Sequence, residues 1–262
     1  MSGFFSSLQP INTIASLTIQ EGVKTRLIPL VLGLLFVGVL LSSFAGTLAV
    51  TESREIQSAL LGSFLRLAGV LVLCLFVLNS QVREYHDKGL ELILALPVPR
   101  SHYFFGKLAG HASLAFLMVL SFAATLLFYA PADQVFIWSV SLFFELLIVV
   151  ALSLFCLFTF NQVPAAFTVV FAIYLLSRVM TSLILVGQGP IMPQQVVVNW
   201  VMNQMMWALS FLLPGLDRFT QSRWLAYGGA AADDLLFVVG QGTIYLLFLG
   251  GAALIDLYRK SV

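Results

Sequence analysis

Residues 135–186 read VFIWSVSLFFELLIVVALSLFCLFTFNQVPAAFTVVFAIYLLSRVMTSLILV and carry only two charged side chains, Glu145 and Arg178. The polar tetrapeptide NQVP (161–164) divides this stretch into two apolar halves. About 20 apolar residues suffice for a helix to cross a bilayer, and each half is longer than that. Pro164 falls in the first turn of the second half, where a proline is well tolerated. The stretch therefore predicts two membrane-spanning helices in a tight hairpin, as antiparallel neighbours.

The composition of the whole chain agrees with a membrane protein. Of its 262 residues, 60% are hydrophobic and 10% are charged, whereas about a quarter are charged in soluble domains. Helices satisfy all their backbone groups internally, as hydrocarbon demands. We therefore expect an all-α integral membrane protein, a single transmembrane domain over residues 1–262. Its six predicted spans cover residues 27–50, 64–82, 104–129, 135–160, 163–186 and 235–258.

The placement of Lys and Arg predicts the orientation, because cytoplasmic loops are enriched in these residues. With the N-terminus inside, the inner segments hold Lys24, Arg26, Arg83, Lys88, Arg100, Lys107, Arg259 and Lys260. The outer segments then hold Arg54, Arg66, Arg218 and Arg223. Both termini are therefore expected in the cytoplasm.

Two further segments are too short or too polar to cross the membrane. Residues 10–26 mix apolar and polar side chains and end in two cations, which predicts an amphipathic helix lying in the inner interface. The long outer segment, residues 187–234, contains Trp200 and Trp207 and is broken at Pro214. Tryptophan is typical of membrane interfaces, so we expect short interfacial or re-entrant helices here.

Charge is concentrated between the second and third spans, in REYHDKGLELILALPVPRSHYFFGK (83–107). This stretch holds seven of the 25 Asp, Glu, Lys and Arg residues of the chain. Leu90, Ile93 and Leu94 recur at helical spacing, and Pro97 and Pro99 stop the pattern. The pattern predicts a short helix on the cytoplasmic surface within residues 83–100. The alternative is an ordinary solvated loop that happens to be helical.

The same stretch resembles the loop between the second and third spans of ABC-2 type transporter permeases. The matching residues are Glu84, Gly89, Glu91, Leu94, Leu96, Pro97, Val98 and Arg100, followed by Gly106-Lys107; Glu84 lies one residue further out than usual. The six spans, the N-terminal amphipathic helix and the long outer segment agree with that family over nearly the whole chain. The segment LLPGLDRF (212–219) and the chain length are similar to the permeases associated with copper-enzyme maturation.

The resemblance implies a permease subunit of an ATP-driven exporter in a bacterial cytoplasmic membrane. Residues 83–100 would form the coupling helix that contacts the ATPase subunit. The residues expected to serve that contact are Glu84, Asp87, Lys88, Gly89, Glu91, Pro97 and Arg100. A six-span half also implies a second permease chain, either identical or related.

The chain carries no nucleotide-binding loop of its own. No GxxxxGK[ST] pattern occurs, because the only Gly-Lys pair, Gly106-Lys107, is followed by Leu108. ATP and Mg²⁺ are therefore expected on separate ATPase subunits, and no cofactor or catalytic residue is expected in this chain. The scattered Lys and Arg also give no face for nucleic acid.

Two other classes of function remain open. An intramembrane enzyme would need a nucleophilic, paired-acid or metal set inside the spans. The three histidines, His86, His102 and His111, instead lie near the inner interface, and none belongs to an HExxH pattern. No metal site is expected. An ATP-independent transporter or channel would normally place several ionisable groups in its spans, and only Glu145 and Arg178 lie deep in them.

Two local predictions concern helix packing. A charge buried alone in a membrane is expensive, so Glu145 and Arg178 are expected to pair, either to hold two helices in register or to contact cargo. Gly106 and Gly110 form a small-xxx-small pattern that permits close approach of another helix. In a chain with 19 glycines, that spacing also arises by chance.

Overall fold

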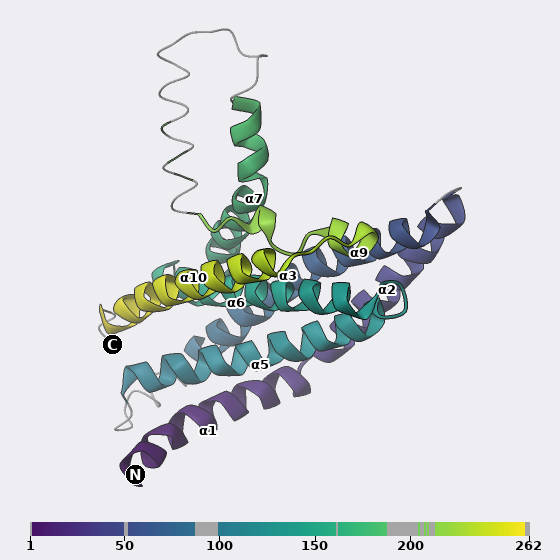
Figure 1. The fold of residues 1–262 in the computed structure, drawn as a ribbon. Helices are drawn as coiled ribbons and strands as arrows, with labels where there is room; N and C mark the ends of the chain where they lie inside the picture. Colours follow the sequence, from purple (N-terminus) through teal and green to yellow (C-terminus); the bar gives the residue numbers. More distant parts are fainter. Residues whose placement is uncertain are drawn as a thin grey trace.

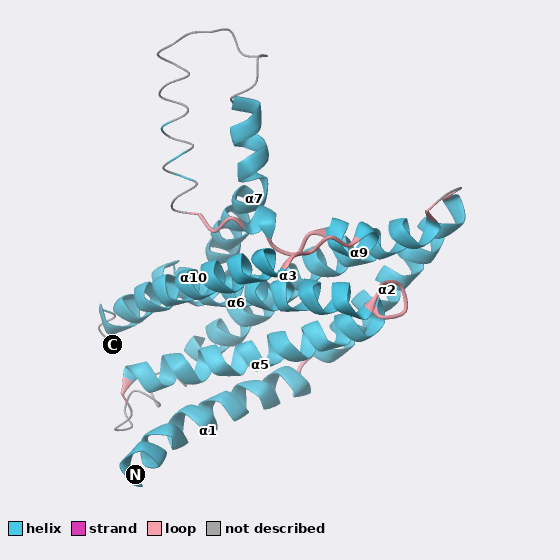
Figure 2. Cartoon of the chain, viewed as in Figure 1, coloured by secondary structure: helices cyan, strands magenta, loops and turns pink. Residues whose placement is uncertain are grey.

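The computed structural model describes residues 2–49, 52–86, 99–160, 162–187 and 213–259, together with Gln204, Trp207 and Leu209. Within these ranges the chain forms helices joined by short loops and contains no strand (Figures 1 and 2). The elements are α1 (Ser2–Lys24), α2 (Leu27–Leu48), α3 (Ser53–His86), α5 (Arg100–Leu126), α6 (Ala132–Phe160), α7 (Val163–Gly187), the 3₁₀ turn η1 (Leu216–Arg218), α9 (Ser222–Tyr227) and α10 (Ala232–Arg259).

Six of the described helices are long and apolar enough to cross a membrane: α2, α3, α5, α6, α7 and α10. This confirms the predicted all-α membrane fold and its six spans. The prediction for the second span was too short, since α3 starts at Ser53 rather than at residue 64. The apolar run marks only the part of the helix suited to lipid. The first turns of α3 are instead held by hydrogen bonds, from Ser58 Oγ to the carbonyl of Leu225 and between the hydroxyls of Ser63 and Ser222.

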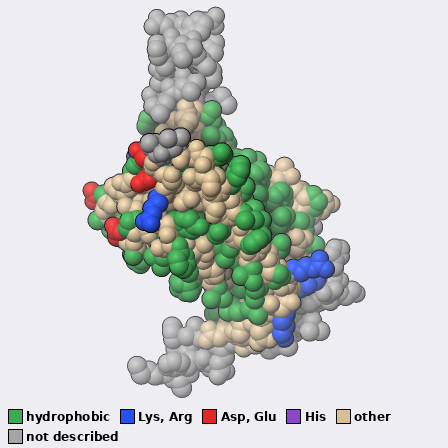
Figure 3. All heavy atoms as spheres, turned by 90° about the vertical axis from the view of Figure 1, so that its right-hand side faces the viewer, with side chains coloured by type: hydrophobic (Ala, Val, Ile, Leu, Met, Phe, Trp, Pro, Cys, Tyr) green, Lys and Arg blue, Asp and Glu red, His purple; other side chains and the backbone are tan. Residues whose placement is uncertain are grey.

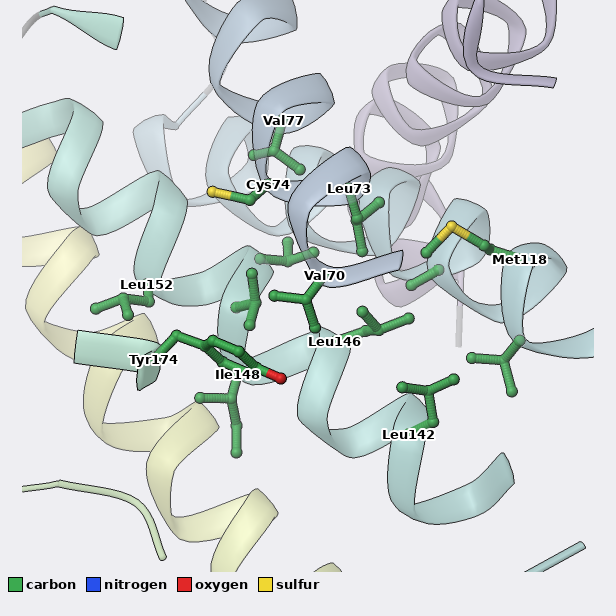
Figure 4. Packing of buried hydrophobic residues seen from close by; sticks show 14 of the residues in the cluster. Val70, Leu73, Cys74, Val77, Met118, Leu142, Leu146, Ile148, Leu152 and Tyr174 are labelled. Carbon is green, nitrogen blue, oxygen red and sulfur yellow. The ribbon is translucent and has the colours of Figure 1, made fainter. Parts of the chain in front are cut away.

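Helix α6 forms the centre of the bundle. In its most apolar stretch 78% of the residues are buried, against 22–44% in the other five candidate spans. It packs against α3, α5, α7 and α10. In Figure 4, Leu146 of α6 lies beside Val70 of α3, Leu142 follows one turn away along α6, and the ring of Tyr174 from α7 reaches into the same layer. A continuous apolar core therefore joins α3, α6 and α7.

The outer helices leave apolar side chains uncovered. Phe36 and Phe44 of α2 and Leu247 of α10 are each more than half exposed. Figure 3 shows broad apolar areas on one face, with charged side chains in a few separate places. A water-soluble protein rarely exposes so much contiguous apolar surface, whereas lipid would cover it.

Helix α7 does not run along α6 as the hairpin prediction assumed. In Figure 1 it crosses the bundle steeply and then projects beyond it. The short connection fixes only where α7 begins, with the amide of Ala166 bonded to the carbonyl of Gln162. The crossing angle is set by side-chain packing further along, where α7 contacts α6, α3 and η1.

Helix α1 packs along the first half of α5. It covers most of the segment predicted as an amphipathic helix, residues 10–26, and starts earlier, at Ser2. A Cβ added to Gly110 would lie 2.6 Å from the Cβ of Thr18 and 3.1 Å from the carbonyl oxygen of Ala15. Gly106 meets Ile14 in the same way. The predicted small-residue pattern is therefore a site of close helix approach, and its partner is α1.

The two described ends of the chain lie at one end of the bundle (Figure 1). The C-terminal end of α3 and the start of α5 lie at that end too. We refer to it as the terminal end. The charged stretch expected to meet an ATPase is therefore attached at the same end as both termini.

Candidate functional site

A buried carboxylate on α6 is the centre of the first polar cluster, which we call the Glu145 cluster. Glu145 is fully buried, about 20 Å along the helix from Ala132. The Tyr174 hydroxyl donates to its Oε1 at 2.8 Å, and the Thr220 hydroxyl donates to its Oε2 at 2.5 Å. Arg178 Nη1 lies 3.7 Å from Oε2. The structure thus brings together the two residues that were expected to pair.

The Arg178 guanidinium also binds the segment before α9, residues 213–221, which we call the strap. Nη1 donates to the carbonyls of Leu216 (2.5 Å) and Phe219 (2.8 Å), and Nη2 donates to that of Thr220 (3.2 Å). Because an arginine presents several donors in a fixed fork, one side chain can hold several carbonyls. Arg178 therefore anchors the strap to α7 while facing the carboxylate on α6.

Thr220 is the strap residue that lies deepest in the cluster. Its φ of 45° is rare for a β-branched residue and costs on the order of 1–3 kcal/mol. Four hydrogen bonds to other elements compensate: Thr220 donates to Glu145, its amide donates to Ser141 Oγ at 2.7 Å, and its carbonyl accepts from Arg178 and, at 2.8 Å, from Arg66. The strained backbone is held where the helices α3, α6 and α7 meet.

Sequence reasoning missed Arg66 as a member of this cluster. Because the predicted second span began at residue 64, Arg66 was assigned to the outer side. In the structure it lies well inside α3 and close enough to Glu145 and Arg178 to interact with both charges. The cluster holds two guanidinium groups and one carboxylate. The sequence did offer one indication that Arg66 is buried: it lies two residues inside the predicted second span.

The outer end of α9 is tied down separately. The Tyr227 hydroxyl donates to Glu52 Oε2 at 3.1 Å, and this bond to a carboxylate raises the pKa of Tyr227. Together with the contacts of Ser58 and Ser63, this bond fastens α9 along the first turns of α3. Helix α9 is therefore packed onto the bundle, whereas Trp207, in the same long segment, is 64% exposed.

A second polar cluster lies between α3 and α5 at the terminal end; we call it the Lys107 cluster. Lys107 Nζ lies 2.5 Å from Glu84 Oε2, with only 8% and 17% of the two side chains exposed. Nearby, the Tyr103 hydroxyl donates to Gln81 Oε1 at 3.2 Å. His111 Nδ1 lies 2.8 Å from the Lys107 carbonyl.

The structure differs from the sequence prediction on Glu84. Glu84 belongs to the last turns of α3 rather than to a separate coupling helix, and its carboxylate already has a cation within the chain. The helix of the second span simply continues past its apolar run to His86. Glu84 therefore faces α5 instead of standing ready for a partner protein.

Arg100, the other flank of the charged stretch, also makes contacts within the chain. It is the first residue of α5, and its Nη1 donates to the carbonyls of Leu257 (3.0 Å) and Tyr258 (3.2 Å) at the end of α10. These carbonyls belong to the last turn, where a helix leaves its acceptors unsatisfied. Arg100 thus joins the start of α5 to the end of the last span.

Five of the residues expected to contact an ATPase lie outside the described residues: Asp87, Lys88, Gly89, Glu91 and Pro97. The same holds for Trp200 in the outer segment. The structure does describe the two flanks of the charged stretch: Glu84 is paired with Lys107, and Arg100 is bonded to the end of α10.

The six long apolar helices, the lipid-suited surface and the buried charge clusters define a multi-pass integral membrane protein. Residues 22–188 match the family model described as ABC-2 family transporter protein. Because that match covers well over half of the chain, the protein belongs to this family, which confirms the resemblance seen in its sequence. The family provides the membrane-spanning permease component of ABC transporters and is not itself catalytic. A comparison with curated proteins found no match.

Proposed function

We propose that this chain is the permease subunit of an ATP-driven exporter, with separate ATPase subunits docking at residues 83–100. In this proposal the terminal end of the bundle faces the cytoplasm of a bacterial cell, and two permease chains, identical or related, form the transporter. ATP and Mg²⁺ are bound by the ATPases. The family membership supports the permease role, and the excess of Lys and Arg at the terminal end supports the orientation.

The observation that carries the proposal is how the charged stretch is anchored. On one side it follows α3, which is joined to α5 through Glu84 and Lys107. On the other side it leads into Arg100, which is bonded to the end of α10. A force applied between these two points would reach three spans directly. Movement of a docked ATPase would therefore be transmitted directly to α3, α5 and α10.

A charge-reversal experiment tests this coupling. The double variant Lys88→Glu/Glu91→Lys keeps the net charge of the stretch and inverts its pattern. If the stretch docks an ATPase through complementary charges, the variant should cut the stimulation of ATP hydrolysis by the permease several-fold. The measurement is the ATPase rate of the co-reconstituted complex in liposomes.

The matched control reverses two charges at the other end of the bundle, in Arg223→Glu/Asp233→Lys. This control should keep the stimulated rate. An unchanged rate in the Lys88/Glu91 variant, or an equal loss in both variants, would count against docking at residues 83–100. Substrate flux through liposomes that hold the permease without any ATPase would instead favour an ATP-independent transporter.

For the Glu145 cluster we propose a structural role. The described hydrogen bonds and the ion pair of its two arginines go to the strap and to the carboxylate, and Arg66 also interacts with Tyr174, so these contacts hold α3, α6, α7 and the strap in register. In a direct role in cargo binding, by contrast, replacing Glu145 would change which substrate is carried. A loss of stability in Glu145→Gln supports the structural role, whereas a changed substrate with unchanged stability supports cargo binding.

A further inference from the structure

A groove of about 900 Å³ lies between the α1–α2 turn and the second half of α3. Its walls include Leu30, Val72, Leu75 and Phe76, and the exposed fractions of Leu30 (52%) and Leu75 (39%) show that it opens on the apolar surface of the bundle. This volume is in the range of sites that hold small organic molecules. The wall of the groove suits an apolar chain.

The mouth of the groove is charged and net positive. Arg26, Arg83 and Glu21 line it, giving two cations against one anion. Arg83 binds Glu21 at 2.5 Å. The guanidinium of Arg26 has no hydrogen-bond or ion-pair partner within the described part of the chain, and it lies at the start of α2. An anion at this mouth would therefore meet an uncompensated cation.

The backbone and one buried side chain add donors at the same place. Arg26 is the N-cap of α2 but makes no side-chain cap bond. Because Pro29 has no N–H and the Leu30 amide is bonded to the Arg26 carbonyl, the amides of Leu27 and Ile28 are the donors that this helix start offers an anion. Ser80 also lines the groove. It is 4% exposed, and its hydroxyl has no hydrogen-bond partner among the described residues. A buried hydroxyl without a partner is unfavourable unless a ligand or water completes it.

We propose that this groove binds one phospholipid with an anionic headgroup, with its phosphate at Arg26 and the start of α2 and an acyl chain along Leu75 and Phe76. Basic pockets between membrane helices on the cytoplasmic side are suited to such headgroups. The leaflet follows from the orientation proposed above, but the site itself does not depend on it. A bound lipid would also wedge α1 and α2 against α3, next to the ion pair of Arg83 with Glu21.

The test counts lipids that stay bound to the full-length protein. The protein is reconstituted into nanodiscs with equal amounts of phosphatidylcholine and phosphatidylglycerol, released, and weighed by native mass spectrometry. We expect one phosphatidylglycerol to be retained in preference to phosphatidylcholine. Arg26→Gln should lower the affinity for phosphatidylglycerol about fivefold, the effect of one basic residue near a membrane surface.

Matched variants separate the site from general surface charge. Lys24→Gln removes a cation two residues away that does not line the groove, and should leave retention unchanged. Arg26→Lys should restore binding, which guards against a folding defect in Arg26→Gln. Leu75→Trp fills the groove and should reduce the retention of both lipids.

Three outcomes would overturn the proposal. These are equal retention of the two lipids by the wild-type protein, an Arg26→Gln variant that binds like wild type, and a Leu75→Trp variant that changes the oligomeric state without changing lipid retention. The last result would assign the groove to a second permease chain. Because no ATPase or ATP takes part, failure here leaves the proposed transport function standing.

Discussion

The Glu145 cluster and the Lys107 cluster are both buried and charged, but they are built differently. In the first, two arginines and one carboxylate converge on a single segment, and the three strap carbonyls of Leu216, Phe219 and Thr220 are all bonded. In the second, one cation meets one anion. In the described chain both clusters keep buried nitrogens without a hydrogen-bond partner: Arg66 Nε in the first, and Gln81 Nε2 and His111 Nε2 in the second.

This difference makes the Glu145 cluster a fixed joint, which holds its elements in one position, and the Lys107 cluster an adjustable joint, which can change partners. A group with several bonds to one segment cannot change partners without losing all of them, so the Glu145 cluster holds the strap in one position. A buried polar atom without a partner is unfavourable and favours any rearrangement that supplies one, and in the Lys107 cluster no set of bonds to a strap opposes such a rearrangement. The Lys107 cluster lies where the charged stretch leaves α3, so a movement of that stretch could supply new partners. We expect rigidity at the strap and rearrangement at the terminal end.

The largest effect is expected from Glu145→Gln. It removes the only carboxylate of the Glu145 cluster and leaves Arg66 and Arg178 facing each other without a counter-charge. Breaking a buried ion pair by removing one partner typically costs about 3–5 kcal/mol. The variant should therefore lose much of its folded fraction in detergent, measured by thermal unfolding or by yield after size-exclusion chromatography.

A second substitution distinguishes charge balance from lost contacts. In Glu145→Gln/Arg178→Gln only Arg66 remains charged, so the double variant should be more stable than Glu145→Gln alone. Arg178→Gln alone leaves Arg66 to balance Glu145 but removes the three bonds to the strap carbonyls, so it should be less stable than wild type and more stable than Glu145→Gln. If the double variant is the least stable, the two residues act separately and the cluster is not one joint.

The same cluster shows how far the sequence could lead. The apolar runs predicted all six spans, since about 20 apolar residues suffice to span a bilayer. The cost of burying a charge, with the similar depth of the two residues in neighbouring spans, paired Glu145 with Arg178. Neither rule identifies acceptors on the backbone. The strap carbonyls and the Arg66 contact come from a distant segment folding inward, and no periodicity in the strap indicates that.

The terminal end was predicted less well for a related reason. Hydropathy placed the end of the second span at residue 82 and assigned Glu84 to a separate helix. Helix α3 continues to His86, and Lys107 on α5 neutralises Glu84 in its last turns, a contact between two helices that hydropathy does not indicate. For Gly106 and Gly110, spacing predicted a close approach, but only the structure identifies α1 as the partner.

Lys107→Met tests the adjustable joint and should have a smaller effect than Glu145→Gln. Methionine keeps the length of the side chain and leaves the Glu84 carboxylate without its cation. Because that carboxylate is partly exposed, water can replace some of the interaction, and we expect a loss of about 2–3 kcal/mol. Chemical denaturation of the purified protein measures it, and restoring neutrality in Glu84→Gln/Lys107→Met should recover part of the loss.

The stimulation of ATP hydrolysis should distinguish the two clusters more clearly than their effects on stability do. Under the proposed function, Lys107→Met should reduce ATPase stimulation in the fraction that remains folded. In contrast, the folded fraction of Arg178→Gln should keep it. Equal stimulation in both variants would remove the distinction between a fixed and an adjustable joint.

Gly110→Ala probes the helix packing beside the Lys107 cluster. The added methyl group would meet Thr18 and the backbone of α1 at distances that require α1 to shift, so we expect a loss of about 1–2 kcal/mol. Gly251→Ala is the matched control, because a Cβ there meets nothing within 4 Å and only helix propensity changes. A control as unstable as Gly110→Ala would mean that α1 does not pack closely on α5.

The smallest effect is expected at the exposed ion pair between Arg83 and Glu21. Like the pair of Lys107 with Glu84, it joins a cation to a carboxylate at 2.5 Å, but 56% of the Arg83 side chain is exposed, against 8% of Lys107. Water already solvates such a pair, and exposed pairs contribute about 0–1 kcal/mol. Arg83→Gln should therefore change the unfolding free energy by less than about 1 kcal/mol, and added salt should abolish the difference. Chemical denaturation at low and at high salt measures the unfolding free energies of Arg83→Gln and Lys107→Met together. If Arg83→Gln is as damaging as Lys107→Met, burial is not what distinguishes the two pairs, and the ion pair of Arg83 with Glu21 is itself a joint between α1 and α3.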